Sequence, residues 1–581
     1  MLHFGIATNQ VLEVEKSWVD TREMGEGPFF TTNGPFVIFG DSGSESFETI
    51  DRLIFFLYQR RIDREERVVT CWTFDIDNLA RRIMCDAFGR PVNALTQGWK
   101  LHFSRTLARI ERDGLGINFR SIASWTDATR EAMVKCFGGE KWRSEDCARR
   151  CYEFAMAVDA ECVKLGGKMG GTSSSTAMRI WSDKWTKRRP SVPLKNTEEM
   201  DWYRKAFRGG RIEALTEHDL TYCGESAPDI AFKIHRPLRL PEDWTIARID
   251  CRMAYPHAMS GRLPVIGGTE GVHYEWGKPD LDMCGIAEAS VIVNEGGPRV
   301  VGVRGARSGT GENCLGFPSG GEYRGVWTHS TLREMQKHGG IIKTIHRDIT
   351  YRYDYRPLSR FCDAVFRQRR KLEPGPVHDA VGRMSTRLYG MMAMSRSKLV
   401  CESHGTMLAK YGAPKHKTMN WGSLGIARFE DLSYPFGANP VWAAEITARN
   451  HIHLGSKIYE IEQLGGIALH CHTDSITFAI QSDRLESLGL ASSDSAEMGE
   501  WRIDWQGKYV GIFGPQFVIY DGGRYSVAGI PAHAMRDLVN KGRAEIEHRA
   551  SIVEQARNPR RGRVTKTLRL SGADVIMSDK P

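Results

Sequence analysis

The sequence predicts a multidomain protein built from α/β and α+β layers. Its 581 residues are enough for roughly three to five domains or subdomains. Apolar residues make up 41% of the chain and charged residues 26%, so the chain can bury large cores and lacks the composition of a disordered protein. Strand-like and helix-like segments alternate near the N-terminus, whereas a helical hairpin and a β-hairpin stand out in the second half.

The N-terminal region has the alternating pattern of an α/β layer domain. Residues 35–41 are typical of a strand and residues 47–61 of an amphipathic helix, and the same order repeats over 66–88. Residues 144–165 predict a long helix that opens with a serine cap and acidic residues in its first turn. The Gly/Ser-rich residues 166–175 predict a linker, and therefore the first domain boundary.

The second half contains two hairpins of different kinds. Two predicted helices are joined by the sequence EPGP at residues 373–376, where proline and glycine end one helix and begin the next. Two apolar runs that flank Thr473 and Asp474 predict a β-hairpin with an acid at its tip. The expected strands are 245–250, 285–295, 466–472 and 475–480, and the expected helices are 357–372, 376–394 and 440–464.

Charge and cysteine usage exclude several classes of protein. Lysine and arginine total 80 against 71 acidic residues, a net charge of +9 that permits a polyanionic partner without identifying one. The 13 cysteines include no CxxC pair, which argues against a disulfide framework or a structural zinc site. The first residues lack a signal-peptide pattern, and no apolar run is long enough to span a membrane. We therefore expect a cytoplasmic protein with no membrane partner.

Two acids at strand ends are the strongest candidates for chemistry. Asp250 ends one predicted strand and is followed by Tyr255 and a proline, and Asp474 lies at the tip of the β-hairpin. Each acid alone could simply cap a turn. A metal site formed by His470 and His472 is another alternative, but two ligands are fewer than the usual three or four.

Considered together, the two acids indicate phosphoryl-transfer chemistry. Carboxylates that meet on adjacent strands can hold two Mg²⁺ ions on oxygen ligands. Such a site activates an attacking hydroxyl and stabilises the leaving oxygen of an in-line displacement. The arginine-rich helical hairpin between them in sequence would supply a clamp for a triphosphate.

The order of these motifs resembles a family B DNA polymerase, most closely its protein-primed, phage-type branch. Residues 250–256 (DCRMAYP) match the first palm motif DxxSLYP, and residues 472–475 (HTDS) match the second, DTDS. Residues 382–390 (GRMSTRLYG) match the fingers motif KxxxNSxYG. Residues 207–211 (FRGGR) resemble the YxGG element that contacts template, and residues 514–518 (GPQFV) stand where PKxY contacts the primer end.

The resemblance implies a domain order. An RNase H-like 3′–5′ exonuclease-type domain precedes a right-hand polymerase with palm, helical-hairpin fingers and thumb. The expected boundaries are 1–168 for the exonuclease-like domain, 169–260 for the first part of the palm, 261–351 for a palm insertion that serves processivity or contacts a priming protein, 352–398 for the fingers, 399–512 for the second part of the palm and 513–581 for the thumb.

The resemblance also implies roles for individual residues. Asp250 and Asp474 would be the catalytic carboxylates and would hold two Mg²⁺ or Mn²⁺ ions. Tyr255 would lie under the incoming sugar and exclude a 2′-hydroxyl. The remaining nucleotide-binding candidates are Arg369, Arg383, Tyr389 and Gly390, and the DNA-binding candidates are Gly209, Gly210, Arg211, Thr473 and Ser475.

Several positions depart from the family pattern. The first acid of DTDS is His472, and the fingers lysine is Gly382, with Arg383 one step around the helix. The remaining departures are Thr386 and Arg387 in place of Asn-Ser, Gln516 in place of the PKxY lysine and Val518 in place of its tyrosine. They suggest a divergent, poorly processive or partly degenerate enzyme.

The exonuclease motifs are weaker than the palm motifs. The candidate acids are Asp20, Glu23, Asp77 and Asp159. In the DxE motif the glutamate comes one residue late, at Glu23, which on a strand moves its carboxylate to the opposite face. The third motif has Ala155 where a tyrosine is usual. An active exonuclease and an inactive relic of its fold are both compatible with these residues.

The expected function is template-directed DNA synthesis from dNTPs on a primer–template, in the replication of a phage or mobile element. A terminal priming protein is compatible with this branch, and the host cytoplasm would be the location if the chain is phage-encoded. The alternatives are a 3′–5′ exonuclease with weakened polymerase activity and a non-catalytic DNA-binding relic. The basic residues 557–566 would let a thumb grip duplex phosphates, although such runs are often only solvated.

Overall fold

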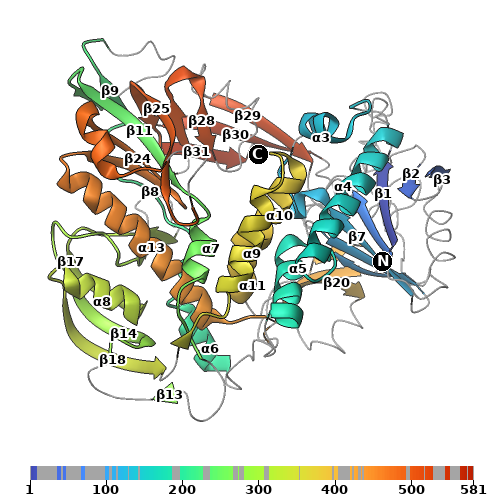
Figure 1. The fold of residues 1–581 in the computed structure, drawn as a ribbon, viewed down its shortest axis with the longest axis horizontal. Coiled ribbons are helices and arrows are strands. Elements are labelled where there is room, and N and C mark those ends of the chain that lie inside the picture. Colours follow the sequence, from blue (N-terminus) through green and yellow to red (C-terminus); the bar gives the residue numbers. More distant parts are fainter. Residues whose placement is uncertain are drawn as a thin grey trace. The chain divides into compact units, whose positions relative to one another are not determined.

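A computed structural model describes most of the chain (Figure 1). The described residues are 2–8, 36–40, 43–47, 67–71, 99–103, 107–112, 115–128, 130–141, 144–185, 197–226, 236–265, 272–273, 280–306, 313–351, 354–394, 398–403, 419–421, 424–429, 434, 437–491, 497–515, 517–527, 543–549, 563–571 and 574–579. The chain forms two compact units, and each draws on separate stretches of sequence. Unit 1 comprises residues 1–189, 363–436 and 548–564, and unit 2 comprises 190–362, 437–547 and 565–581.

Unit 1 contains a seven-stranded mixed sheet. Its strand order is β3-β2-β1-β4-β7-β6-β5, in which β1, β4 and β7 run parallel and the remaining neighbours pair antiparallel. The strands are β1 Leu2–Thr8, β2 Phe36–Gly40, β3 Gly43–Phe47, β4 Arg67–Cys71, β5 Trp99–Phe103, β6 Leu107–Arg112 and β7 Leu115–Ser121. This sheet confirms the strands predicted over 35–41 and 66–74. Most of the helix predicted over 47–61, and the one after residue 76, lies outside the described residues.

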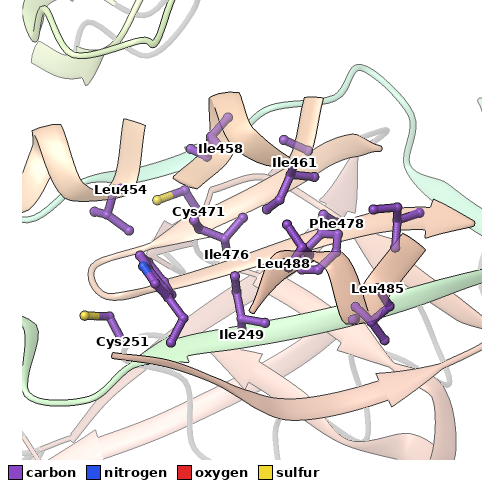
Figure 2. Close-up of a cluster of buried hydrophobic side chains, with 14 of the residues drawn as sticks. Ile249, Cys251, Leu454, Ile458, Ile461, Cys471, Ile476, Phe478, Leu485 and Leu488 are labelled. Carbon is purple, nitrogen blue, oxygen red and sulfur yellow. The ribbon is translucent and has the colours of Figure 1, made fainter. Parts of the chain in front are cut away.

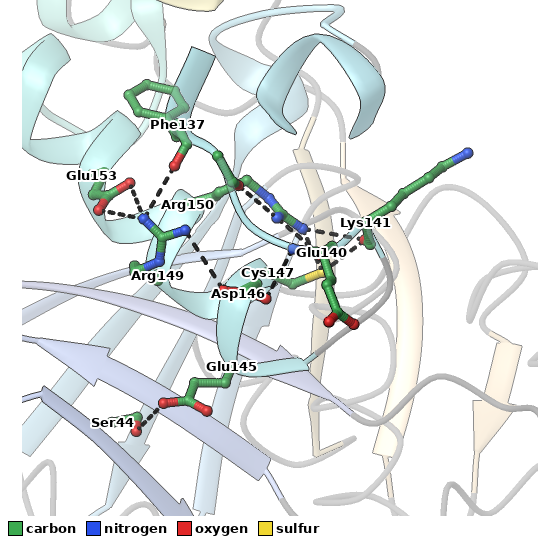
Figure 3. Close-up of polar contacts among 11 residues, drawn as sticks. Ser44, Phe137, Glu140, Lys141, Glu145, Asp146, Cys147, Arg149, Arg150 and Glu153 are labelled. Atoms are coloured by element: carbon green, nitrogen blue, oxygen red, sulfur yellow. Dashed lines mark hydrogen bonds and ion pairs between the residues drawn. The ribbon is translucent and has the colours of Figure 1, made fainter. Parts of the chain in front are cut away.

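The long helix α4 (Ser144–Lys164) packs against β1, β2 and β4. Its first turns are tied to the preceding helix α3 (Arg130–Phe137) by two arginines (Figure 3). Arg149 donates to the carbonyl of Phe137 at 3.1 Å and also pairs with Glu153 at 2.8 Å. Arg150 is buried and donates to the carbonyls of Gly138 and Glu140, both at 3.0 Å. These bonds fix the α3–α4 connection.

The Gly/Ser-rich segment after α4 is not a linker, so that prediction was wrong. Thr172 caps the helix α5 (Ser173–Ile180), and the side chains of Thr172 and Ser175 bond reciprocally in a capping box. The serines that suggested flexibility therefore begin a helix. The compact unit continues to residue 189, beyond the predicted boundary at residue 168.

The predicted helical hairpin is present. The helix α9 (Ser359–Arg370) and the helix α10 (Pro376–Thr386) are separated by the EPGP sequence, and Pro376 occupies the first turn of α10. The second predicted helix is interrupted at Arg387, after which α11 (Leu388–Met392) begins. Within unit 1, α10 packs on α4 and α5, and the Cys162 and Met384 sulfur atoms lie 4.0 Å apart.

Unit 2 is organised around a five-stranded sheet of order β25-β11-β24-β23-β8. The strands are β8 Ile212–Ala214, β11 Trp244–Cys251, β23 Ile467–His472, β24 Ser475–Gln481 and β25 Trp501–Gly507. The helix α13 (Pro440–Gln463) covers one face, where Ile458 and Ile461 pack on Ile249, Ile476 and other apolar side chains of the sheet (Figure 2). Alternation along β11 therefore turns Ile246, Arg248 and Asp250 to the opposite face of the sheet.

Part of that opposite face is covered by a second sheet, of order β10-β9-β26-β27-β28. Its strands are β9 Leu220–Cys223, β10 Pro237–Leu240, β26 Tyr509–Ile512, β27 Phe517–Tyr520 and β28 Tyr525–Val527. Ile246 and Leu469 of the first sheet pack against Val510 and Val518 of the second. The polar end of the first sheet, which carries Asp250, lies beyond this apolar contact.

The residues of the predicted insertion form a four-stranded sheet of order β13-β18-β14-β17, beside the helix α8 (His329–Lys337). Its strands are β13 Val272–His273, β14 Cys284–Val293, β17 Gly321–Thr328 and β18 Ile341–Tyr351. Further two-stranded sheets pair β12 (Leu263–Pro264) with β19 (Asp354–Tyr355), and β15 (Val303–Ala306) with β16 (Asn313–Gly316).

The remaining described elements are short helices and two three-stranded sheets. The sheets have the orders β20-β22-β21 and β29-β30-β31. The elements are α6 Thr197–Arg204, α7 Ala254–Met259, β20 Lys398–Ser403, β21 Met419–Trp421, β22 Leu424–Phe429, β29 Arg543–Arg549, β30 Arg563–Ser571 and β31 Asp574–Asp579. None of the helices in the described ranges combines the length and apolar character that crossing a bilayer requires.

Candidate active site

The two strand-end acids lie on neighbouring strands. β11 and β24 pair antiparallel with Asp250 opposite Ser475, and the amide of Cys251 donates to the carbonyl of Asp474 at 2.8 Å. Asp474 follows β23 and precedes β24, so it lies in the turn of the β-hairpin. The structure therefore brings together the two carboxylates that the sequence singled out.

Strained backbone flanks both acids. Thr473 has a φ of +62°, and the amide of Asp474 bonds to the carbonyl of His472 at 2.7 Å, which closes a tight γ-turn around Thr473. On the other strand, Met253 has a φ of +52° at the start of α7. A positive φ is unusual outside glycine, and strained for a β-branched residue such as threonine. Such strain persists only where the surroundings hold the backbone in place, and it clusters at functional sites.

The turn at residues 472–475, which we call the catalytic turn, is fixed by hydrogen bonds to Arg211 and Asn450. The amide of Thr473 donates to the carbonyl of Arg211 at 2.6 Å, and the side chain of Asn450 donates to the carbonyl of Thr473 at 3.0 Å. His451, next to Asn450 on α13, bonds the carbonyl of Gly209 at 2.8 Å. The helix α13 therefore fixes both the catalytic turn and the Gly209–Gly210 segment.

The two acids repel one another in a partly desolvated setting. Burial, followed by the nearby charge of Asp250, raises the pKa of Asp474 to about 7. Burial also raises the pKa of Asp250, although the neighbouring guanidinium of Arg502 opposes the shift. Two close carboxylates whose pKa values are raised in this way form an environment that a cation would stabilise.

Two arginines that the motifs did not identify lie beside the acids. Arg502 on β25 reaches the Asp250 carboxylate at 3.4 Å. Arg248, two residues before Asp250 on β11, donates to the Ser475 hydroxyl at 3.1 Å and pairs with Asp504 at 3.5 Å. Strand alternation could have indicated Arg248, because residues two apart share a face. Nothing local in the sequence indicates Arg502, because it meets Asp250 only through strand pairing.

Tyr255 lies on α7, close to the backbone of Gly210. Its side chain is buried, and its hydroxyl would lie 3.3 Å from a Cβ at Gly210. The same Cβ would approach Thr473 Cγ2 to 3.4 Å. Gly210 therefore lets the backbone come close to both Tyr255 and the catalytic turn.

Arg211 differs from its expected role as a DNA contact. Its side chain is fully buried, donates to Glu213 at 2.6 Å and to the carbonyl of Arg299 at 2.8 Å, and lies over the ring of Phe317. A guanidinium enclosed in this way offers no surface to a phosphate backbone, and we correct the prediction accordingly. Its position suits support of the catalytic turn.

The alternative of a histidine metal site gains no support. His470 bonds the carbonyl of Pro515 at 2.8 Å, and the rings of His470 and His472 are stacked 6.2 Å apart. Among the residues that the structure describes, no group of three or more histidines, cysteines and acids could enclose a metal, so neither the two histidines nor the two acids form a complete protein cage.

The carboxylate pair, in contrast, has the donor chemistry that Mg²⁺ prefers. Hard divalent cations take oxygen ligands, commonly one or two carboxylates completed by water and substrate phosphates. Asp250 and Asp474 supply two such carboxylates whose pKa values are raised by burial. The residues present therefore fit a magnesium or manganese site.

The predicted nucleotide-binding residues of the helical hairpin lie in unit 1. Arg369 on α9 packs against Gly382 on α10, and Arg383 forms an ion pair with Asp127. Burial, followed by the charge of Arg387, lowers the pKa of Arg383 to about 10. The last two candidates, Tyr389 and Gly390, lie on α11, where Gly390 is exposed.

The exonuclease candidates are only partly described. Asp20, Glu23 and Asp77 lie outside the described residues, as do Gln516 and the basic residues 557–562. Asp159 lies on α4, where its carboxylate accepts the amide of Met169 at 2.6 Å. This bond ties the end of α4 to the segment that follows it.

No family model matches this chain, and no curated protein sequence is similar to it. The chain has the fold of a DNA polymerase. Structures of Phi29 DNA polymerase match it over 100% of this chain and 99% of theirs.

The complex with primer-template DNA and incoming nucleotides has a TM-score of 0.62 at 13% identity. The binary complex with primer-template DNA gives 0.61 at 12%, and the complex with single-stranded DNA gives 0.61 at 11%. The agreement confirms, for the fold, the resemblance drawn from the motifs.

Proposed function

We propose that this protein is a template-directed DNA polymerase that adds dNTPs to a primer 3′-hydroxyl. The observation that carries the proposal is the pair Asp250 and Asp474, which adjoin on β11 and the catalytic turn in a chain with a DNA polymerase fold. The primer-template DNA and nucleotides in the Phi29 complexes support the same substrates here.

The residues of the site suit this chemistry. Asp250 and Asp474 would hold Mg²⁺ or Mn²⁺, which when bound would lower the pKa of the attacking hydroxyl and stabilise the leaving oxygen. Tyr255, fixed beneath Gly210, would limit the space at the sugar and disfavour a 2′-hydroxyl. Arg369 and Arg383 would bind the triphosphate, with Tyr389 and Gly390 beside the new base pair. Catalysis would then rest on positioning and electrostatics.

The domain ranges, the DNA contacts and the mode of replication are further parts of this proposal. The domain ranges follow the polymerase order, from an exonuclease-like N-terminal domain, which would extend beyond the expected residue 168, to a thumb at residues 513–581. Gly209, Gly210 and Thr473 would lie along the DNA. Ser475 is buried and its hydroxyl donates to the carbonyl of His472 at 3.1 Å, so it would shape the catalytic turn and not contact DNA. Protein-primed replication of a phage or mobile element, with a terminal priming protein as partner, fits the resemblance to the protein-primed branch.

Primer extension with purified variants tests the proposal. Asp250→Asn and Asp474→Asn should each lower extension by at least about a hundredfold while leaving the Kd for primer–template unchanged. Asp243→Asn is the matched control, because this exposed acid precedes the opposite end of β11. Normal extension by either site variant would show that the site is misassigned.

The same assay separates the alternatives. Mg²⁺-dependent shortening of a labelled 3′ end without dNTP incorporation would indicate an exonuclease with a weakened polymerase. A protein that binds primer–template but shows no turnover with Mg²⁺ or Mn²⁺ would be a DNA-binding relic. Incorporation that needs metal, template and both acids is the result we expect.

A further inference from the structure

A buried arginine links the catalytic turn to a distant part of unit 2. Arg211 is fully buried, yet it carries a charge that must be compensated. Glu213 provides the counter-charge: one of its carboxylate oxygens accepts from Arg211 at 2.6 Å. The other oxygen accepts the backbone amide of Phe317 at 2.7 Å. A single carboxylate therefore holds both Arg211 and the chain at residue 317.

The partners that enclose Arg211 come from the insertion at residues 261–351. The carbonyl of Arg299 accepts from Arg211 at 2.8 Å, and the Phe317 ring lies 4.2 Å from the guanidinium carbon. Phe317 also makes an edge contact with the ring of His451, at 4.8 Å between centroids. Arg299 itself pairs with Glu462 on α13 at 2.9 Å. Two groups of the insertion, the carbonyl of Arg299 and the ring of Phe317, therefore contact the Arg211 side chain.

The backbone carbonyl of Arg211 supports the catalytic turn directly. It accepts the amide of Thr473, the residue with a φ of +62° immediately before Asp474. His451, which touches Phe317, bonds the carbonyl of Gly209, two residues before Arg211. Moving Phe317 would therefore loosen both supports of the segment that holds the catalytic turn. A strained turn depends on such supports to persist.

We propose that Phe317 is a positioning residue: through Arg211 and His451, it makes the geometry of the catalytic turn, and so the rate of nucleotide addition, depend on the insertion. The proposal rests on the polymerase function proposed above. Phe317 touches neither acid. Its effect on the rate arises because misplacing a catalytic carboxylate by as little as 1 Å costs on the order of a hundredfold.

The test compares Phe317→Leu with Tyr323→Ala. Leucine keeps the site apolar and removes the ring that covers Arg211 and His451. Tyr323 is partly buried against the apolar cluster of the insertion, and its hydroxyl donates to the carbonyl of Gly320 at 2.9 Å, so its loss measures the effect of a general disturbance of the insertion. Single-turnover incorporation gives the rate constant and the dNTP Kd, and a binding assay gives the primer–template Kd.

We expect Phe317→Leu to lower the rate constant by roughly tenfold to a hundredfold with both Kd values unchanged, and Tyr323→Ala to keep the wild-type rate constant. Amide hydrogen exchange, which needs no activity, should be faster in the peptide spanning residues 472–475 of Phe317→Leu only. A wild-type rate constant in Phe317→Leu, or an equal loss in Tyr323→Ala, would overturn the proposal. A wild-type protein that extends no primer would instead contradict the polymerase function, and the exchange result would still decide whether Phe317 holds the turn.

Discussion

The side chain of Arg369 occupies the space beside Gly382 that any side chain at that position would need. A Cβ at Gly382 would lie 2.8 Å from Arg369 Nε and 3.0 Å from its Cζ. Gly382 is buried on α10, and Arg369 is the last arginine but one of α9. Glycine at position 382, where the motif KxxxNSxYG has lysine, therefore lets Arg369 lie against α10.

This contact predicts that a larger residue at position 382 will impair nucleotide binding. Gly382→Ala and Gly382→Lys should both displace Arg369 and raise the dNTP Kd by roughly tenfold, because a charge-assisted hydrogen bond to a phosphate would be lost. Gly375→Ala is the control, since Gly375 lies in the same hairpin with extended backbone and open space around it. An unchanged or lower dNTP Kd in Gly382→Ala, which adds no charge, would mean that Arg369 does not hold the triphosphate.

The raised pKa of Asp474 predicts a pH-dependent effect of Mg²⁺ on stability. Its pKa of about 7 lies above the ordinary value of 3.8, so the folded protein holds this proton more tightly than the unfolded chain does. Without metal, the stability contributed by this proton is present below pH 4 and is lost as the pH rises to about 7. Mg²⁺ should therefore raise the Tm more at pH 8 than at pH 5, as measured by thermal unfolding.

Asp474→Asn provides the control for this pH dependence. The amide carries no charge at either pH, so the variant should lose most of the extra Mg²⁺ effect at pH 8. An equal rise in Tm at both pH values in the wild-type protein would argue that the cation binds elsewhere.

The sequence predicted the local parts of this molecule better than its long-range contacts. The catalytic turn was predicted because two short apolar runs flank Thr473 and Asp474, and the sequence also predicted the long helix over 440–464 that the structure shows as α13. The linker prediction failed because glycine and serine suit loops and helix caps equally, and only the reciprocal bonds of Thr172 decide between them. Arg502 meets Asp250, and Phe317 meets Arg211 and His451, through contacts between distant segments, which local patterns do not encode.

The position of Tyr255 predicts its part in sugar selection. Tyr255→Ala should reduce the preference for dNTPs over rNTPs by roughly 10–200-fold, because the buried ring would no longer limit the space beside Gly210. Tyr255→Phe keeps the ring and should retain most of the preference. The ratio of kcat/KM values for the two nucleotides measures the effect. Unchanged discrimination in Tyr255→Ala would exclude a steric role.

Asp159, an exonuclease candidate, makes a hydrogen bond within unit 1, and this bond predicts the stability of its variants. Its carboxylate accepts the buried Met169 amide at 2.6 Å, so Asp159→Ala should lower the free energy of unfolding by about 1–3 kcal/mol. Asp159→Asn keeps an acceptor oxygen and should remain within about 0.5–1.5 kcal/mol of the wild-type protein. Urea unfolding of the three proteins measures both effects. If Asp159→Ala is as stable as the wild type, the bond to Met169 contributes nothing. If Asp159→Asn is stable but loses 3′-end degradation, the loss can then be assigned to chemistry and not to unfolding.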